Sequence, residues 1–109
     1  MSTRLFAVLS ALALPALSLA ADDLSDPVAV AAAMRKANDF YVSKLAVHGG
    51  YASSWKRGPG PGRSEHREGE NLISIQPPGT PTVGLAMLRA YEATGDEAFL
   101  EGARGAARA

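Results

Sequence analysis

The sequence predicts an all-α domain that follows an export leader. Three observations lead to this fold class. Apolar residues recur at spacings of three and four in three segments after residue 26, which is the period of one helix face. A helix-capping residue precedes each segment, and glycine follows the first two. A long segment rich in glycine and proline separates the first helix from the others, and we expect it to form one long loop.

Residues 1–20 have the parts of a secretory signal peptide. Arg4 stands near the amino end, and the apolar run from Leu5 to Leu14 follows it. This run is too short to cross a bilayer core of about 30 Å as a helix. Ser18 and Ala20 are the small residues that signal peptidase requires, so we expect cleavage after Ala20. The protein is therefore expected to be exported, to the periplasm or the extracellular space. The alternative is an uncleaved amino-terminal anchor.

The first helix is expected to begin at Pro27, with Ser25 or Asp26 as its N-cap. Its apolar face consists of Val30, Ala33, Ala37, Tyr41 and Leu45. Gly49-Gly50 is expected to end the helix, because glycine adopts the left-handed conformation that a C-terminal cap needs. His48 is accordingly interpreted as a histidine at the end of a helix.

Residues 51–79 contain no helical pattern. Gly58 to Gly62 alternates glycine with proline, which excludes regular structure within it. Leu72 to Ile75 alternates briefly and could be one short strand or an extended segment. Loops of this length in a compact domain are usually either functional or disordered.

Thr80 and Pro81 are expected to open the second helix, as N-cap and first helical residue, and Gly95 to end it. Asp96 is expected to cap a third helix at once, so that the two form an αα-hairpin. Small residues in both helices should let their backbones approach closely (Gly84, Ala86, Ala90, Gly102, Ala103, Gly105 and Ala106). The apolar pattern of the third helix continues up to Ala109. We therefore interpret residues 21–109 as the amino-terminal part of a longer helical domain.

The charges of the chain favour neither a nucleic acid nor a membrane surface as partner. Without Arg4 of the leader, ten basic side chains stand against eleven acidic ones. The loop alone is expected to be a solvated, self-compensating charge run, since its basic residues (Lys56, Arg57, Arg63 and Arg67) are interspersed with glutamates (Glu65, Glu68 and Glu70). The sequence has no cysteine, so disulfides do not stabilise it.

One run of residues has a sequence pattern that is more specific than its composition. The segment from Gln76 to Gly84, QPPGTPTVG, is followed by the helical hairpin and preceded by His48-Gly49-Gly50-Tyr51 and Glu68-Gly69-Glu70. Together these residues resemble the amino-terminal part of the pectic acid lyases, the pectate lyases of polysaccharide lyase family 10. The resemblance extends over about residues 28–109. It implies αα-hairpins arranged as an incomplete α/α toroid.

The resemblance also implies an activity, the cleavage of polygalacturonate, an acidic plant polysaccharide, by β-elimination. In this chemistry a cation, usually calcium, neutralises the uronate carboxylate, and an arginine removes the neighbouring ring proton. The catalytic arginine and acidic residues of the family lie beyond the matched region. No residue here inherits a catalytic role, no metal ligand is assigned, and calcium is expected only in a longer protein. We expect this chain alone to be inactive.

Three residues are candidates for substrate binding. Tyr51 and Trp55 can stack on sugar rings, although aromatic residues here can equally cover the end of the first helix. Gln76 stands in the QPPGTPTVG run, which can instead be an extended strap that starts a helix. Two other functions remain open: a secreted helical-repeat module that binds a protein partner, and another α/α-toroid carbohydrate enzyme, a hydrolase or an epimerase.

Overall fold

Three helices and a small sheet make up the computed structural model, which describes residues 24–57, 60–65 and 67–109. The predicted leader, residues 1–20, lies outside these ranges. Helix α1 (Pro27–Phe40) continues as a π-helical turn, η1 (Tyr41–Leu45), and helices α2 (Thr80–Thr94) and α3 (Glu97–Arg108) follow. Between them lie strands β1 (Ser54–Trp55), β2 (Gly62–Ser64) and β3 (Arg67–Gly69).

The expectation of an all-α fold, and of an incomplete toroid, is wrong. The predicted Gly/Pro-rich loop contains a three-stranded antiparallel sheet in the order β1-β2-β3, so the domain is a small mixed α/β structure. Trp55 pairs with Gly62, and Arg63 pairs with Glu68. Strands of two or three residues are too short to show the alternation by which strands are recognised. Leu72 to Ile75, which does alternate, forms no strand.

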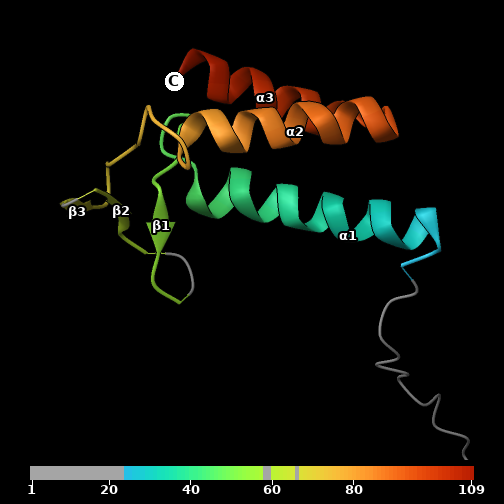
Figure 1. Cartoon of the computed structure of the whole chain (residues 1–109), viewed down its shortest axis with the longest axis horizontal. Coiled ribbons are helices and arrows are strands. Elements are labelled where there is room, and N and C mark those ends of the chain that lie inside the picture. The colour runs from blue at the N-terminus through green and yellow to red at the C-terminus, as the bar shows by residue number, and fades with distance from the viewer. Residues whose placement is uncertain (1–23, 58–59, 66) are drawn as a thin grey trace, which may run out of the picture.

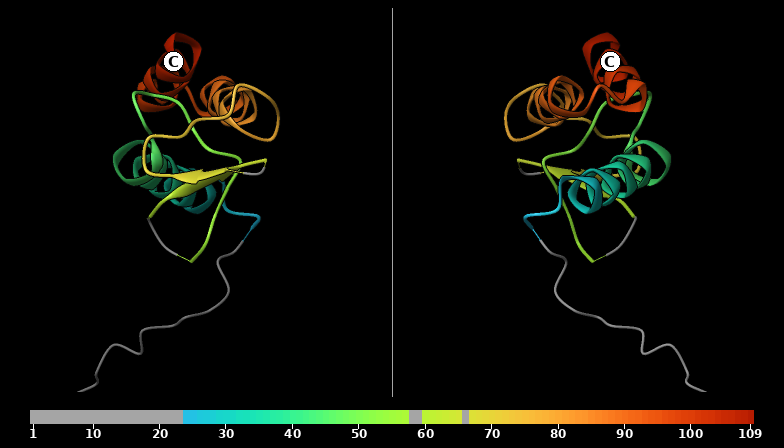
Figure 2. Two further views of the ribbon diagram at one scale, coloured as in Figure 1. Left: turned by 90° about the vertical axis from the view of Figure 1, so that its left-hand side faces the viewer. Right: turned by 90° about the vertical axis from the view of Figure 1, so that its right-hand side faces the viewer.

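The sheet lies at one end of the three helices. Helix α1 runs beneath the α2–α3 hairpin, antiparallel to α2 and parallel to α3 (Figure 1). The end views show α2 and α3 side by side with α1 below them (Figure 2). The end of η1, the start of α2 and the sheet are therefore neighbours, and the loop segments between them meet at this end of the molecule.

Helix α1 begins as predicted but ends earlier. The Asp26 carboxylate accepts a hydrogen bond of 2.9 Å from the Val28 N–H, which confirms the N-cap. The chain leaves the helical conformation at Ala46, so Gly49-Gly50 is not its cap. Instead His48 and Gly49 have φ angles of 51° and 86°, a two-residue hairpin turn flanked by paired Val47 and Gly50. His48 thus lies in this turn and not at a helix end.

The α2–α3 hairpin is confirmed, with Gly95 (φ 69°) ending α2 and the Asp96 side chain capping α3 through the Ala98 N–H at 3.0 Å. The helices are also as close as the small residues predicted. A Cβ atom added at Gly84 would lie 2.8 Å from the Ala106 Cβ. One added at Gly102 would lie 2.6 Å from the Met87 Sδ and 3.2 Å from the Asn38 Oδ1, so all three helices meet at Gly102.

Thr80 does not cap α2 as predicted, because its hydroxyl has another role. Gly79 is the N-cap residue, and Thr80 is the first residue of the helix. The Thr80 Oγ1 accepts a hydrogen bond from the Tyr51 N–H (2.9 Å) and donates to the Tyr51 carbonyl (3.2 Å). Ser74 completes the connection, since its N–H donates to the Tyr51 carbonyl and its own carbonyl accepts from the Thr80 N–H. The segment before α2 is thereby fixed to the segment after η1.

The core lies where these segments meet the helices. Leu45, Tyr51 and Met87 are buried together, and Tyr41, Trp55 and Val83 pack against them. Phe99 of α3 is also buried, at 2% exposure. In the part of the chain that the structure describes, no helix combines the length and the apolar character needed to cross a membrane.

Candidate functional site

A polar pocket of about 350 Å³ opens between the end of η1 and the sheet. Side chains from four segments line it: Lys44 of η1, His48 of the hairpin turn, Trp55 of β1, and Glu70, Asn71 and Leu72 after β3. Its volume is within the range of small-ligand sites, about 300–1,000 Å³, and it combines an aromatic residue with several polar groups. This pocket is therefore the candidate functional site.

Trp55, one of the three predicted substrate-binding residues, forms the aromatic wall. The Tyr41 ring meets the indole nearly edge to face, with centroids 6.2 Å apart and planes at 77°. On the neighbouring strand Gly62 stands opposite, and a Cβ atom there would lie 3.2 Å from the indole Nε1. The same Cβ atom would lie only 2.4 Å from the Ala52 Cβ, so the absence of a side chain at Gly62 makes room chiefly for Ala52 and secondarily for the indole. Trp55 is half-buried, so part of it remains accessible in the pocket.

Tyr51 lies in the core and does not line the pocket. It is 1% exposed, and its ring lies 5.8 Å from that of Tyr41. Burial, and to a lesser degree the neighbouring Tyr41, raises the pKa of its phenol. This placement favours the alternative role considered for Tyr51, in which the ring covers the end of the first helix. Substrate contact by Tyr51 stays a prediction.

Gln76 is exposed in the turn before α2 and is not part of the pocket. Its carbonyl accepts hydrogen bonds from the Gly79 N–H (2.8 Å) and the Ser74 hydroxyl (3.0 Å). The Pro77–Pro78 peptide bond within this turn is cis. The backbone of Gln76 thus holds the strap that leads into α2, and the structure does not bring Gln76 together with Trp55.

Lys44 and Asn71 join the site although the sequence did not point to them. Lys44 stands in the last turn of a helix, where a basic residue is ordinary, and Asn71 follows a strand that the sequence did not reveal. Lys44 is exposed, and among the described residues it forms no ion pair. The packing of η1 against Trp55 of β1 brings Lys44 and Trp55 to the same pocket.

The charged residues of the sheet partly neutralise one another, as predicted. The Glu68 carboxylate lies 3.7 Å from the Lys56 Nζ and 3.9 Å from the Arg63 Nε. The Glu68 carboxylate is therefore paired with two basic side chains. Glu70 lines the pocket, and Glu68 does not. In the described ranges no three His, Asp or Glu side chains gather as a metal site. The resemblance implies calcium only in a longer protein, so calcium stays an expectation and we derive no step through it here.

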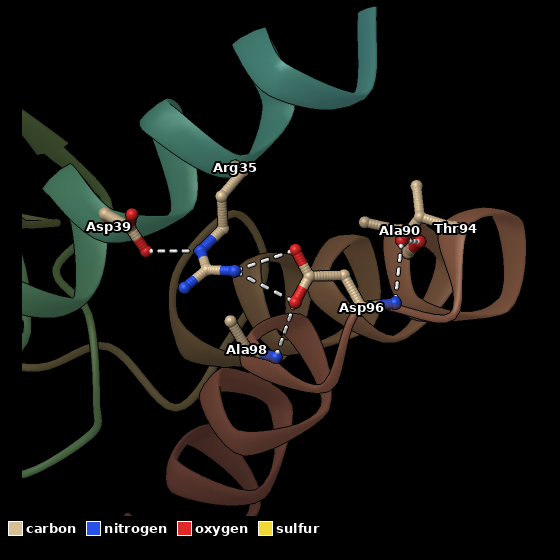
Figure 3. A network of polar contacts seen from close by, with 6 residues as sticks. All are labelled: Arg35, Asp39, Ala90, Thr94, Asp96 and Ala98. Atoms are coloured by element: carbon tan, nitrogen blue, oxygen red, sulfur yellow. Dashed lines mark hydrogen bonds and ion pairs between the residues drawn. The ribbon is translucent and has the colours of Figure 1, made fainter. Parts of the chain in front are cut away.

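A second polar network lies at the other end of the helices and is structural (Figure 3). The Arg35 guanidinium donates to the Asp96 carboxylate at 2.8 and 3.0 Å and to Asp39 at 2.9 Å. The hydrogen bonds with Asp96 and then Asp39 raise the pKa of Arg35. The Ala98 N–H, followed by Arg35, lowers the pKa of Asp96. This network fastens α1 to the start of α3.

An apolar groove of about 300 Å³ runs along the α2–α3 hairpin, remote from the polar lining described above. Leu85 and Leu88, which are 51% and 37% exposed, form one wall, and Ala103, Ala106 and Ala107 form the other. Ile75, which is 80% exposed, borders an adjoining hollow. Exposed apolar surface of this kind is typical of interaction surfaces.

Comparisons with known proteins add no family to this description. Protein-family models, curated proteins and solved structures were compared with the chain, and none matches.

Proposed function

We propose that this chain is part of an exported pectate lyase-like protein, and that its Trp55 pocket binds galacturonate units of polygalacturonate. One observation carries the proposal: a half-buried indole, in contact with the Tyr41 ring, lines the same polar pocket as Lys44. Sugar rings have an apolar face that suits an aromatic wall and a polar rim that suits the remaining groups.

The sequence supports the same proposal independently of the pocket. The QPPGTPTVG run resembles the pectic acid lyases, and the leader predicts export to the compartment in which such a polymer is met. In this proposal the chain contributes substrate binding. The base that removes the ring proton, and the cation that acidifies it, belong to residues outside those matched here.

Intrinsic fluorescence tests the binding step, because Trp55 is the only tryptophan of the chain. We expect trigalacturonate to change the Trp55 emission with a saturable dependence on concentration. Calorimetry should show the same binding and its loss in Trp55→Ala. The control is Tyr91→Ala, which removes an aromatic residue of α2 that does not line the pocket. An unchanged emission at all concentrations of oligogalacturonides contradicts the proposal.

Turnover is measured in parallel by the ultraviolet absorbance of the double bond that β-elimination creates. We expect none from this chain alone. Release of unsaturated products by this chain would contradict the assignment of the catalytic groups to other residues. Release of saturated sugars would indicate a hydrolase.

The partner-binding module is the second candidate, and the apolar groove on α2 and α3 favours it. The exposure of Leu85 and Leu88 is the specific observation. The fluorescence titration separates the two candidates, since a response of Trp55 to uronides supports sugar binding and has no basis in a module that uses only the groove.

A further inference from the structure

We propose that Lys44 recognises the carboxylate of an acidic sugar in the Trp55 pocket directly, without a bridging metal ion. The inference rests on the proposed function and adds the residue that distinguishes an acidic sugar from a neutral one. It follows from three features: the position of Lys44 in the pocket, the pairing of the nearby basic side chains with Glu68, and the presence of Glu70 among the described residues that line the pocket.

The first feature is the position of Lys44. Lys44 lies one residue before the buried Leu45, which anchors the end of η1 in the core. Lys44 lines the same pocket as Trp55, whose indole packs against the Tyr41 ring. A ring stacked on the indole therefore brings its substituents within the pocket that Lys44 borders. The backbone that carries Lys44 is anchored by Leu45, and its flexible four-carbon side chain lets the ammonium group reach a ligand in the pocket.

The ion-pair partners of the other basic side chains nearby also point to Lys44. Lys56 follows β1 and Arg63 lies on β2, and both face the Glu68 carboxylate. Neither lines the pocket. Lys44 has no carboxylate partner among the residues that the structure describes, so its charge is available to an anionic ligand. Among the described residues that line the pocket, it is the one that carries a fixed positive charge.

Glu70 supplies the opposing charge and sharpens the test. It lines the pocket from the turn after β3, whereas Lys44 comes from η1. A carboxylate ligand is attracted by Lys44 and repelled by Glu70, while the Glu70 oxygens can accept hydrogen bonds from sugar hydroxyls. Removing the Lys44 charge should thus lower the affinity for an acidic sugar, and removing the Glu70 charge should raise it. For an uncharged sugar neither electrostatic effect applies.

The experiment titrates Trp55 fluorescence with trigalacturonate and with its fully methyl-esterified form, at low salt and with EDTA present. The ester has the same rings without the charges. We expect the acid to bind more tightly than the ester by up to about fivefold, the upper limit for an exposed ion pair. Lys44→Met should abolish this preference and Lys44→Arg should keep it. Glu70→Gln should increase it. Lys36→Met, at an exposed lysine of α1 outside the pocket, is the control and should leave it unchanged.

Three results would overturn the inference while leaving sugar binding intact. These are equal affinities for acid and ester in the unmodified chain, a preference that persists in Lys44→Met, and a preference that appears only when calcium replaces EDTA. If neither oligosaccharide changes the fluorescence, the proposed function fails and the role of Lys44 fails with it. The two failures are therefore distinguishable.

Discussion

Thr80 shows how one side chain can matter more through a tertiary contact than through the local role that the sequence suggests. Thr80 is 7% exposed, and its hydroxyl joins the start of α2 to both backbone groups of Tyr51. The Tyr51 carbonyl has a second donor in the Ser74 N–H. The Tyr51 N–H donates to the Thr80 hydroxyl, so removing this hydroxyl removes the acceptor of that N–H.

Thr80→Val is predicted to destabilise the protein by about 1–3 kcal/mol, the cost of leaving a buried N–H unpaired. Valine keeps the shape of threonine, so the loss isolates the hydrogen bonds from packing. Urea unfolding followed by circular dichroism measures the change. Thr82→Val, the same replacement at an exposed position of the same helix, is the control and should change stability by less than about 0.5 kcal/mol. Equal effects at the two positions would mean that the Thr80 hydroxyl contributes nothing specific.

At the residue scale, the sequence predicted what local chemistry determines. Asp26, Gly95 and Asp96 act as expected because a cap or a left-handed turn involves only neighbouring residues. Trp55 is a candidate because an aromatic ring can stack on a sugar, and it does line a pocket. The burial of Tyr51 and the place of Lys44 beside Trp55 depend on segments far apart in the chain, so no local pattern announced them.

At the scale of elements, the same distinction explains why the helices were predicted and the sheet was not. Each helix contains several turns, so its apolar period is readable. The strands contain two or three residues, and their pairing is fixed by cross-strand partners such as Arg63 and Glu68. Similarly, Gly49 was interpreted as a helix cap, but the π-helical turn at Tyr41–Leu45 ends the helix sooner and leaves Gly49 for a hairpin turn.

The connection of α1 to α3 through Asp96 leads to a prediction on pH. The folded protein holds the pKa of Asp96 below its usual value of about 3.9, chiefly through the Ala98 N–H and then Arg35. A lowered folded-state pKa gives a stabilisation that is complete above the unfolded pKa and is lost as the pH falls through the folded pKa. Asp96→Asn keeps a side chain that can cap a helix but cannot ionise.

We therefore expect Asp96→Asn to be less stable than the unmodified protein at pH 7, and this difference to shrink as the pH is lowered below about 4. Urea unfolding at several pH values measures it. The Arg35→Gln background separates the two causes, because the part that survives there belongs to the Ala98 N–H. A difference that stays constant between pH 7 and pH 2.5 would show that the Asp96 charge has no part in stability.

At the scale of the whole molecule, the two ends of the helices differ in what they contain. The Arg35 network and the Gly95 turn close one end, while the sheet, the strap and the Trp55 pocket occupy the other (Figure 1). The η1 turn connects them, since it belongs to the long helix and supplies Lys44 to the pocket. Placing a binding site beside a sheet of very short strands requires such a rigid support, and the packed helices provide it.

The leader gives the last prediction, because the proposed function requires export. Arg4, the apolar run from Leu5 and the small residues Ser18 and Ala20 predict that the exported protein begins at Ala21. Removal of residues 1–20 leaves α1 with its start intact, since its cap is Asp26 and its first residue Pro27. Mass spectrometry of the exported protein should find Ala21 at the amino end, and circular dichroism should retain the helical signal. An Ala20→Gln variant should remain uncleaved, whereas Ala20→Ser, which keeps a small residue, should be processed normally. Exported protein that retains Met1 would instead indicate the uncleaved anchor, and a substrate site held at the membrane.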